Sequence, residues 1–206
     1  GGFKERLRAS KKAGKARGIG MASYIEACAG GSPERADISM QADGSVEVLI
    51  GTQSNGQGHM TAYAQLVSQH LDLPLEKITV IQGDTALIET GGGTGGSRSV
   101  PVGGAAVDGA SRELAQKLLE QGARMLEAAD ADVEISDGAV RIAGTDRAIG
   151  FAEIAAQAAD AGAPLATFYK WKPPEATYPN GTHICEVEID PETGETEILR
   201  YTIVDD

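Results

Sequence analysis

Arg35-Ala-Asp-Ile-Ser-Met-Gln-Ala-Asp-Gly-Ser-Val-Glu-Val-Leu-Ile50 is the stretch that decides the fold class. Within it, two runs of alternating apolar and polar residues flank the pair Asp43-Gly44. Alternation with a period of two is typical of half-buried strands, and Asp-Gly favours a tight reversal between them. We therefore predict a β-hairpin over residues 35–50.

A helix is predicted after this hairpin, over residues 61–73, because apolar residues recur there at helical spacing and Pro74 ends the pattern. In the rest of the chain, predicted hairpins and helices follow one another without a regular order. We expect strands at 18–27 and 77–81, a glycine-rich loop at 85–102, a closely packed helix at 103–128 with a kink at Gly122, a hairpin at 133–142, a helix at 151–161, a loop at 170–175 and a hairpin at 183–204. Since repeated βαβ units are missing from this pattern, the chain is predicted to be an α+β fold of mixed, hairpin-rich sheets packed with helices.

The composition is that of a soluble globular protein. The 206 residues are 41% hydrophobic and carry a formal net charge of -12, which excludes wholesale disorder and allows one large domain or two small ones. The sequence has no apolar run of membrane-spanning length, and its start lacks the apolar segment of a signal peptide. Two distant cysteines support neither a disulfide framework nor a zinc site. We therefore expect a cytoplasmic protein without a membrane span.

The charge is uneven, because residues 1–17 hold seven of the 18 Lys and Arg residues. A basic arm can bind nucleic acid, but the acidic remainder of the chain repels phosphate backbones. We therefore expect no nucleic-acid partner and interpret residues 1–17 as a basic linker or a solvated helical arm. The abrupt start of the arm and the terminal Asp205-Asp206 give the impression of a chain cut from something longer.

The first segment with candidate chemistry is Gly51-Thr-Gln-Ser-Asn-Gly-Gln-Gly-His-Met60, at the junction between a strand and a helix. Glycines let a backbone approach a ligand, and amide side chains both donate and accept hydrogen bonds. The helix that starts near His59 directs free N–H groups toward this place. Two interpretations stay open: a site for an anionic ligand rich in hydrogen-bonding groups, or a polar turn that only caps the helix.

The second segment is Thr90-Gly-Gly-Gly-Thr-Gly-Gly-Ser-Arg-Ser99. It satisfies the G-x-G-x-x-G pattern, but no βαβ unit encloses it, and it lacks the Gly-Lys-Ser/Thr of a phosphate-binding P-loop. Its backbone N–H groups, the hydroxyls of Thr94, Ser97 and Ser99 and the guanidinium of Arg98 can hold a phosphate or another oxyanion. The alternative is a flexible surface loop.

Other chemistry has little support. His59, His70 and His183 share no metal-ligand spacing, so we expect no metal bound by protein side chains. His70 falls on the apolar helix face, where a core role is the ordinary one. Neither serine nor cysteine occurs in the context of a nucleophile elbow. The carboxylates that flank the loops are interpreted as solvated: Asp84, Glu89 and Asp108.

An ordered series of motifs joins the two segments. It comprises Gly51-Thr52, Gly56-Gln-Gly-His-Met-Thr61, Val80-Ile-Gln-Gly-Asp-Thr85, Gly93-Thr-Gly-Gly-Ser-Arg-Ser99 and Gly103-Gly-Ala-Ala-Val107. The series resembles the molybdenum-cofactor-binding large subunit of the xanthine dehydrogenase, aldehyde oxidase and carbon monoxide dehydrogenase family. The resemblance implies that residues 18–206 are part of the second molybdopterin-binding domain of such a subunit, truncated at the C-terminus.

The resemblance also implies a cofactor and its site. The cofactor is a molybdenum-pyranopterin, in some members extended to a cytosine dinucleotide, whose metal is held through the sulfurs of the pterin. The cofactor-binding residues that it implies are Gln57, Gly58, His59, Met60, Thr94, Gly95, Gly96, Ser97, Arg98 and Ser99. The catalytic glutamate of the family lies beyond the end of this chain, so no catalytic residue is assigned.

By the same resemblance, the whole enzyme hydroxylates an aldehyde, a purine, another N-heterocycle or a similar small substrate with water. Its implied partners are the remainder of the large subunit and subunits or domains that carry iron-sulfur clusters and FAD. The 206-residue piece is expected to be inactive alone. The alternative is a non-catalytic α+β module that binds a phosphate-containing ligand.

Overall fold

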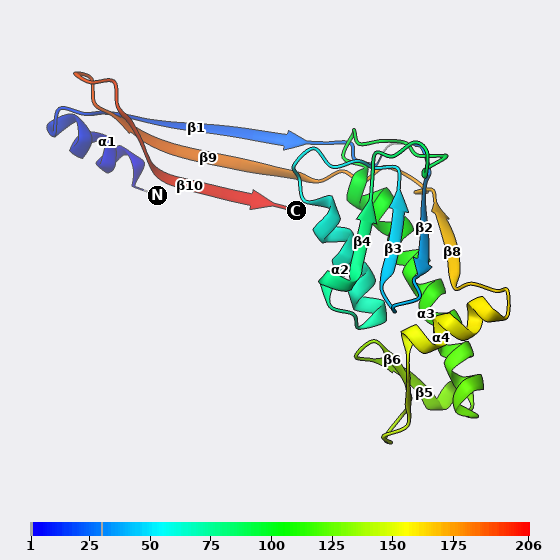
Figure 1. The fold of residues 1–206 in the computed structure, drawn as a ribbon. Coiled ribbons are helices and arrows are strands. Elements are labelled where there is room, and N and C mark those ends of the chain that lie inside the picture. Colours follow the sequence, from blue (N-terminus) through cyan, green and yellow to red (C-terminus); the bar gives the residue numbers. More distant parts are fainter. Residues whose placement is uncertain (1, 30) are drawn as a thin grey trace. The chain divides into compact units, whose positions relative to one another are not determined.

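A computed structural model describes residues 2–29 and 31–206 (Figure 1). Its contacts divide the chain into two compact units. The first combines the residues up to Ala27 with Thr177–Asp206, and the second runs from Cys28 to Ala176. The predicted loops and the cavity that they line belong to the second unit.

The first unit is a helix on a three-stranded antiparallel sheet. Its elements are α1 (Phe3–Lys12), β1 (Ala16–Ile25), β9 (Asn180–Ile189) and β10 (Thr196–Asp205). The strands follow the order β1-β9-β10, so the two ends of the chain share β9 as their common neighbour. The strand predicted at 18–27 and the hairpin predicted at 183–204 are confirmed, with β1 starting two residues earlier.

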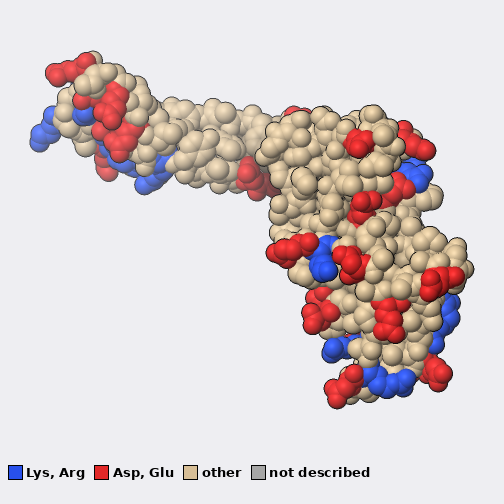
Figure 2. All heavy atoms as spheres, viewed as in Figure 1, with Lys and Arg blue, Asp and Glu red and all other residues tan. Residues whose placement is uncertain are grey.

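Three basic residues of the N-terminal arm pair with carboxylates of β9 and the turn after it. Arg6 donates two hydrogen bonds to Glu186, and Arg17 donates a third at 2.8 Å to the same side chain. Lys15 lies 2.6 Å from Asp190. Figure 2 shows the blue and red side chains side by side in this unit. The arm therefore contains a mostly exposed helix, in agreement with the helical alternative that the sequence predicts, and part of its charge is neutralised within the chain.

The second unit is built on a mixed four-stranded sheet. Its strands are β2 (Glu34–Met40), β3 (Val46–Ile50), β4 (Ile78–Ile81) and β8 (Ala166–Trp171). β2 is antiparallel to both β3 and β8, whereas β3 is parallel to β4. The hairpin predicted over residues 35–50 is thus confirmed as β2–β3, and every second residue of β2 and β3 is buried.

Two helices pack against this sheet and complete the core (Figure 1). α2 (His59–Leu71) contacts β4, and α3 (Ala105–Leu126) contacts β2 and β8. A smaller sheet of β5 (Val133–Ser136), β6 (Ala139–Ile142) and β7 (Ala148–Gly150) lies near the end of α3, with α4 (Phe151–Asp160) following it. Each predicted helix is present, within two residues of its expected ends.

Three local predictions are wrong. The loop predicted at 85–102 ends at Arg98, because Ser99–Gly104 forms a π-helix that leads into α3. Lys170 and Trp171, predicted to lie in a loop, belong to the edge strand β8. α3 is continuous at Gly122, where a Cβ would lie 2.6 Å from that of Val140. This glycine lets β6 approach the helix rather than bending it.

No helix within the described ranges is both long enough and apolar enough to cross a membrane.

The charge pairs of the first unit predict an acid-sensitive stability. A hydrogen bond from Arg6 lowers the pKa of Glu186, one from Ser10 lowers the pKa of Glu188, and one from Lys15 lowers the pKa of Asp190. Their contribution is therefore fully present above the unfolded pKa values, about 3.9 to 4.3, and is lost as the pH falls through the lower folded values. The protection factors for amide hydrogen exchange in β1 and β9, which compare each rate with that of an unfolded chain at the same pH, should fall below about pH 4.

Glu186→Gln should flatten this acid dependence, because it removes the carboxylate that Arg6 and Arg17 share. Glu192→Gln is the matched control, since the Glu192 carboxylate makes no ion pair in the described chain. An acid dependence that is equal in both variants would contradict the assignment.

Candidate functional site

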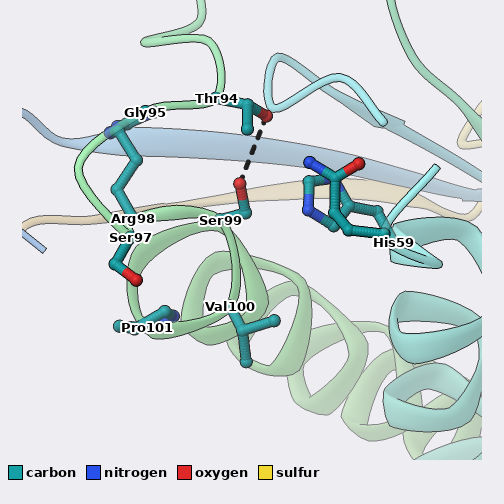
Figure 3. A pocket seen from close by; sticks show the side chains of 9 residues that line it. His59, Thr94, Gly95, Ser97, Arg98, Ser99, Val100 and Pro101 are labelled. Atoms are coloured by element: carbon teal, nitrogen blue, oxygen red, sulfur yellow. Dashed lines mark hydrogen bonds between the residues drawn. The ribbon is translucent and has the colours of Figure 1, made fainter. Parts of the chain in front are cut away.

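A cavity of about 360 Å³ lies where the two glycine-rich segments meet. Gln57 and His59 line it from the first segment. The second segment contributes the lining residues Thr94, Gly95, Ser97, Arg98 and Ser99, and Val100 and Pro101 follow it. Figure 3 shows His59 and the segment from Thr94 to Pro101 around this space. The fold therefore brings together two stretches that are more than thirty residues apart in the sequence.

Seven of the ten predicted site residues line this cavity, and three do not. Gly58 and Gly96 lie beside lining residues, and Met60 has 54% of its surface exposed just after His59. Val100 and Pro101 line the cavity without having been predicted. They are the second and third residues of the π-helix, and a π-helical turn leaves no sequence signal comparable to glycine or a hydroxyl.

The start of α2 presents His59 to the cavity. Gly58, the residue before the helix, has a φ of 79°, a conformation that favours glycine. His59 is only 4% exposed, and its Nδ1 is buried without a hydrogen-bond partner in the described chain. Its ring packs against that of Tyr63, with the centroids 5.6 Å apart. A buried polar atom without a partner is rare, so this nitrogen is available to a ligand.

Gln57 is already partly committed to its own loop. Its side-chain oxygen accepts hydrogen bonds from the backbone N–H of Asn55 and from the Ser54 hydroxyl. This arrangement leaves the amide nitrogen as the polar group of Gln57 that can donate to a ligand.

Hydroxyl groups connect the two segments. Thr94 Oγ1 donates to the backbone oxygen of Gln53 at 2.6 Å and lies 3.2 Å from Ser99 Oγ. In Figure 3 the side chains of Thr94 and Ser99 point toward one another. The hydroxyls of the second segment therefore lie at the wall of the cavity, where they can bond to an oxygen-rich ligand.

Arg98 is buried, and its guanidinium already bonds to other groups of the protein. Its side chain is 5% exposed, and Nη1 lies 2.6 Å from the carboxylate of Glu34, which is 1% exposed. The same nitrogen donates to the backbone oxygen of Gly93 at 2.7 Å. Nη2 donates to the backbone oxygens of Ser32 and Pro33. The terminal nitrogens that the sequence predicts at a phosphate are thus occupied, and Nε is buried without a partner.

Tyr63 fastens α2 to the second segment. Its hydroxyl donates to the backbone oxygen of Ser99 at 2.9 Å and lies 2.6 Å from Thr52 Oγ1. Burial raises the pKa of Tyr63, so the phenol stays protonated as a donor. A Cβ at Gly103 would lie 2.9 Å from this hydroxyl, which explains the glycine at that position.

Two of the remaining candidates differ from their predictions. His70 is half-buried rather than a core residue, and its Nε2 lies 2.7 Å from Asp108 Oδ1. Asp108 also pairs with Arg112 at 2.9 Å, so it is not a lone solvated carboxylate. These contacts connect α2 with α3 away from the cavity. Within the described residues, no three His, Cys, Asp or Glu side chains are grouped to hold a metal ion.

Tyr63→Phe tests whether the phenol hydroxyl holds the site together. The variant removes one hydrogen bond to the Ser99 carbonyl and leaves the buried Thr52 hydroxyl without its Tyr63 partner, so the free energy of unfolding should fall by about 1–3 kcal/mol. Denaturant titration measures this loss. Tyr169→Phe is the control, because no hydrogen bond of the Tyr169 hydroxyl is found in the described chain, and a comparable loss there would contradict the explanation.

Comparisons with known proteins agree with the fold and the loops. The family model described as molybdopterin cofactor-binding domain matches residues 2–206. The chain is 35% identical to the carbon monoxide dehydrogenase large chain of Hydrogenophaga pseudoflava, over 92% of this chain and 26% of that protein. It is 33% identical to the 6-hydroxypseudooxynicotine dehydrogenase complex subunit gamma of Paenarthrobacter nicotinovorans, over 97% of this chain and 26% of that protein.

A solved structure of reconstituted CO dehydrogenase from Oligotropha carboxidovorans superimposes with a TM-score of 0.83 at 30% identity. The match covers 99% of this chain and 28% of that one. The chain thus spans about a quarter of the length of the proteins that it matches. The predicted α+β fold and the resemblance to the molybdenum enzymes are confirmed, and the chain belongs to the molybdopterin cofactor-binding domain family.

Proposed function

We propose that this chain is part of the molybdopterin-binding large subunit of a molybdenum hydroxylase, an enzyme that oxidatively hydroxylates a small molecule with water. One observation carries the proposal: both glycine-rich segments line the same cavity in a chain of the molybdopterin cofactor-binding family. The alternative, a non-catalytic phosphate-binding module, has no comparable support, because the family match covers residues 2–206.

The groups at the cavity fit such a cofactor. A pyranopterin offers ring nitrogens and oxygens that donate and accept hydrogen bonds, and its phosphate accepts several. The cavity presents hydroxyls, and two of its lining residues hold buried polar atoms without partners, His59 Nδ1 and Arg98 Nε. A ligand that bonds to these atoms would remove the unfavourable free energy of leaving them unpaired.

We assign the cofactor contacts to the two segments by their chemistry. Gln57, Gly58, His59 and Met60 would hold the pterin. Thr94, Gly95, Gly96, Ser97 and Ser99 would hold the pterin or its phosphate-bearing tail through hydroxyl and backbone N–H groups. A direct contact from Arg98 stays a prediction, because Glu34 and backbone oxygens occupy its terminal nitrogens.

In this proposal, the side chains of the cavity bind and orient, and the cofactor supplies the two-electron oxidation chemistry. Gln57 positions the pterin and does not exchange a proton with substrate. We assign no acid or base role within residues 1–206, because the resemblance places the catalytic glutamate elsewhere.

The wider assignments follow from the relatives. One is named a large chain and another a subunit of a dehydrogenase complex. We therefore propose that residues 18–206 are part of a larger cofactor-binding domain preceded by the arm at 1–17. The proposed partners are the rest of the large subunit and components that carry iron-sulfur clusters and FAD. A cytoplasmic location, a cytosine dinucleotide form of the cofactor and an aldehyde, purine or other N-heterocycle as substrate complete the proposal.

Metal and pterin analysis tests this function. The whole gene product that contains these residues, made in a host that supplies the cofactor, should hold about one molybdenum and one pterin per subunit, as a single-site cradle requires. The 206-residue chain alone should retain far less. A whole gene product that lacks both in a cofactor-replete host would refute the proposed function.

Thr94→Val tests the site itself, because it removes one hydroxyl and keeps the size of the side chain. This hydroxyl donates to the Gln53 backbone oxygen and so joins the two segments that line the cavity. Loss of the hydrogen bond should weaken cofactor binding by about 1 kcal/mol, roughly fivefold. The pterin retained after dialysis should fall accordingly. Thr79→Val, on the exposed side of β4, is the control. Equal retention in both variants would contradict the assignment of Thr94.

A further inference from the structure

Glu34 is a buried carboxylate that does not line the cavity yet contacts the loop that forms its wall. It is the first residue of β2 and has 1% of its surface exposed. Its Oε2 accepts hydrogen bonds from Arg98 Nη1 at 2.6 Å and from the backbone N–H of Gly92 at 3.0 Å. One carboxylate oxygen thus holds two points of the loop, six residues apart, on the end of a strand of the main sheet.

Arg98 extends this anchor, the set of contacts that holds the loop to the start of β2. Besides Glu34, it donates to the backbone oxygens of Ser32 and Pro33 before β2 and of Gly93 in the loop. The guanidinium lies so close to Gly92 that a Cβ there would come within 2.4 Å of it. The loop therefore folds around the guanidinium, and Glu34 at the start of β2 carries the opposite charge.

One part of the loop conformation that the anchor holds is strained. Gly93 and Gly96 have positive φ angles, which glycine adopts readily, but Ser97 has a φ of 54° as well. A residue other than glycine keeps this conformation only where surrounding contacts fix it. Between the two anchored points, Gly92 and Arg98, lie Thr94, Gly95 and Ser97 of the cavity wall.

A direct ligand role for the Arg98 terminal nitrogens conflicts with this burial. To reach a phosphate, the guanidinium would have to leave Glu34, and the carboxylate would stay buried without its counter-charge. Breaking a buried ion pair in this way is strongly unfavourable. The pair is therefore expected to stay intact when a ligand binds.

We propose that Glu34 is a positioning residue of the cofactor-binding cavity. By holding Arg98 and the Gly92 amide, it fixes the hydroxyls of Thr94, Ser97 and Ser99 at the cavity wall before the ligand arrives. Arg98 affects the site by holding the loop in place, and Glu34 determines where Arg98 lies. This inference rests on the proposed function and assigns a role to a residue that neither glycine-rich segment contains.

A double-mutant cycle tests the proposal in the whole gene product. Glu34→Gln, Arg98→Gln and the double variant are made in a host that supplies the cofactor, and molybdenum and pterin are counted per subunit. Each single variant should lower occupancy by about tenfold or more. The double variant should be no worse than either, because the two residues act as a unit.

Asp37→Asn is the matched control. Asp37 lies on the same strand and pairs with Arg35 at 2.5 Å, but that pair is on the surface, with both side chains more than a third exposed. Occupancy should match that of the wild type. A loss equal to that of Glu34→Gln would overturn the specific role of Glu34.

The opposite pattern identifies direct binding. If the terminal nitrogens of Arg98 bind the ligand in place of Glu34, then Glu34→Gln frees them and occupancy stays equal or rises, whereas Arg98→Gln lowers it. That result would overturn the positioning role. Wild-type protein without molybdenum and pterin would refute the proposed function, whereas loaded wild type together with a fully loaded Glu34→Gln variant would refute this inference alone.

Glu34→Asp covers the case in which the neutral variants fail to fold. It keeps the charge but shortens the reach, so occupancy should lie between those of the wild type and Glu34→Gln. Amide hydrogen exchange should accelerate over residues 92–98 and stay unchanged in β3 and α3. Acceleration that is equal across the second unit would show a merely structural role and would overturn the proposal.

Discussion

The buried ion pair between Glu34 and Arg98 is the interaction on which the cavity depends. Both side chains are almost fully buried, and the two charged groups lie 2.6 Å apart. Burying a charge is strongly unfavourable unless a partner and further hydrogen bonds compensate it. Here backbone oxygens and the Gly92 amide supply those bonds. Because all of them come from the loop or from the residues at the start of β2, they join the loop to the sheet.

Close approach of the backbone makes that position possible. A Cβ at Gly51 would come within 2.4 Å of the Gly91 Cα, so the two glycine-rich segments touch backbone to backbone. The same contact brings the α2 start next to the loop, and the Tyr63 hydroxyl then closes the arrangement on Ser99. The high glycine content, 27 of 206 residues, is thus explained in part by packing of the loops rather than by flexibility.

Local sequence patterns predicted most of the helices and strands, but they could not predict contacts between residues far apart in the sequence. The hairpin of β2 and β3 was predictable because alternation and an Asp-Gly turn occur within sixteen residues. β8 was missed because it is an edge strand whose side chains alternate between exposed and half-buried, so its hydrophobic signal is weak. The site segments were found from glycines and hydroxyls. The role of Arg98 was not, because its partner Glu34 is 64 residues away and precedes the predicted hairpin.

Basic residues of the N-terminal arm also pair with carboxylates that lie far away in the sequence. The sequence shows an excess of Lys and Arg in residues 1–17, and the acidic remainder argues against nucleic acid. The structure gives a role to three of these residues, since Arg6 and Arg17 share Glu186 and Lys15 pairs with Asp190. Glu186 is nearly buried by these contacts. In both units, then, a basic side chain meets a buried carboxylate at a strand of a sheet, and the segment that carries the base takes its position from the strand.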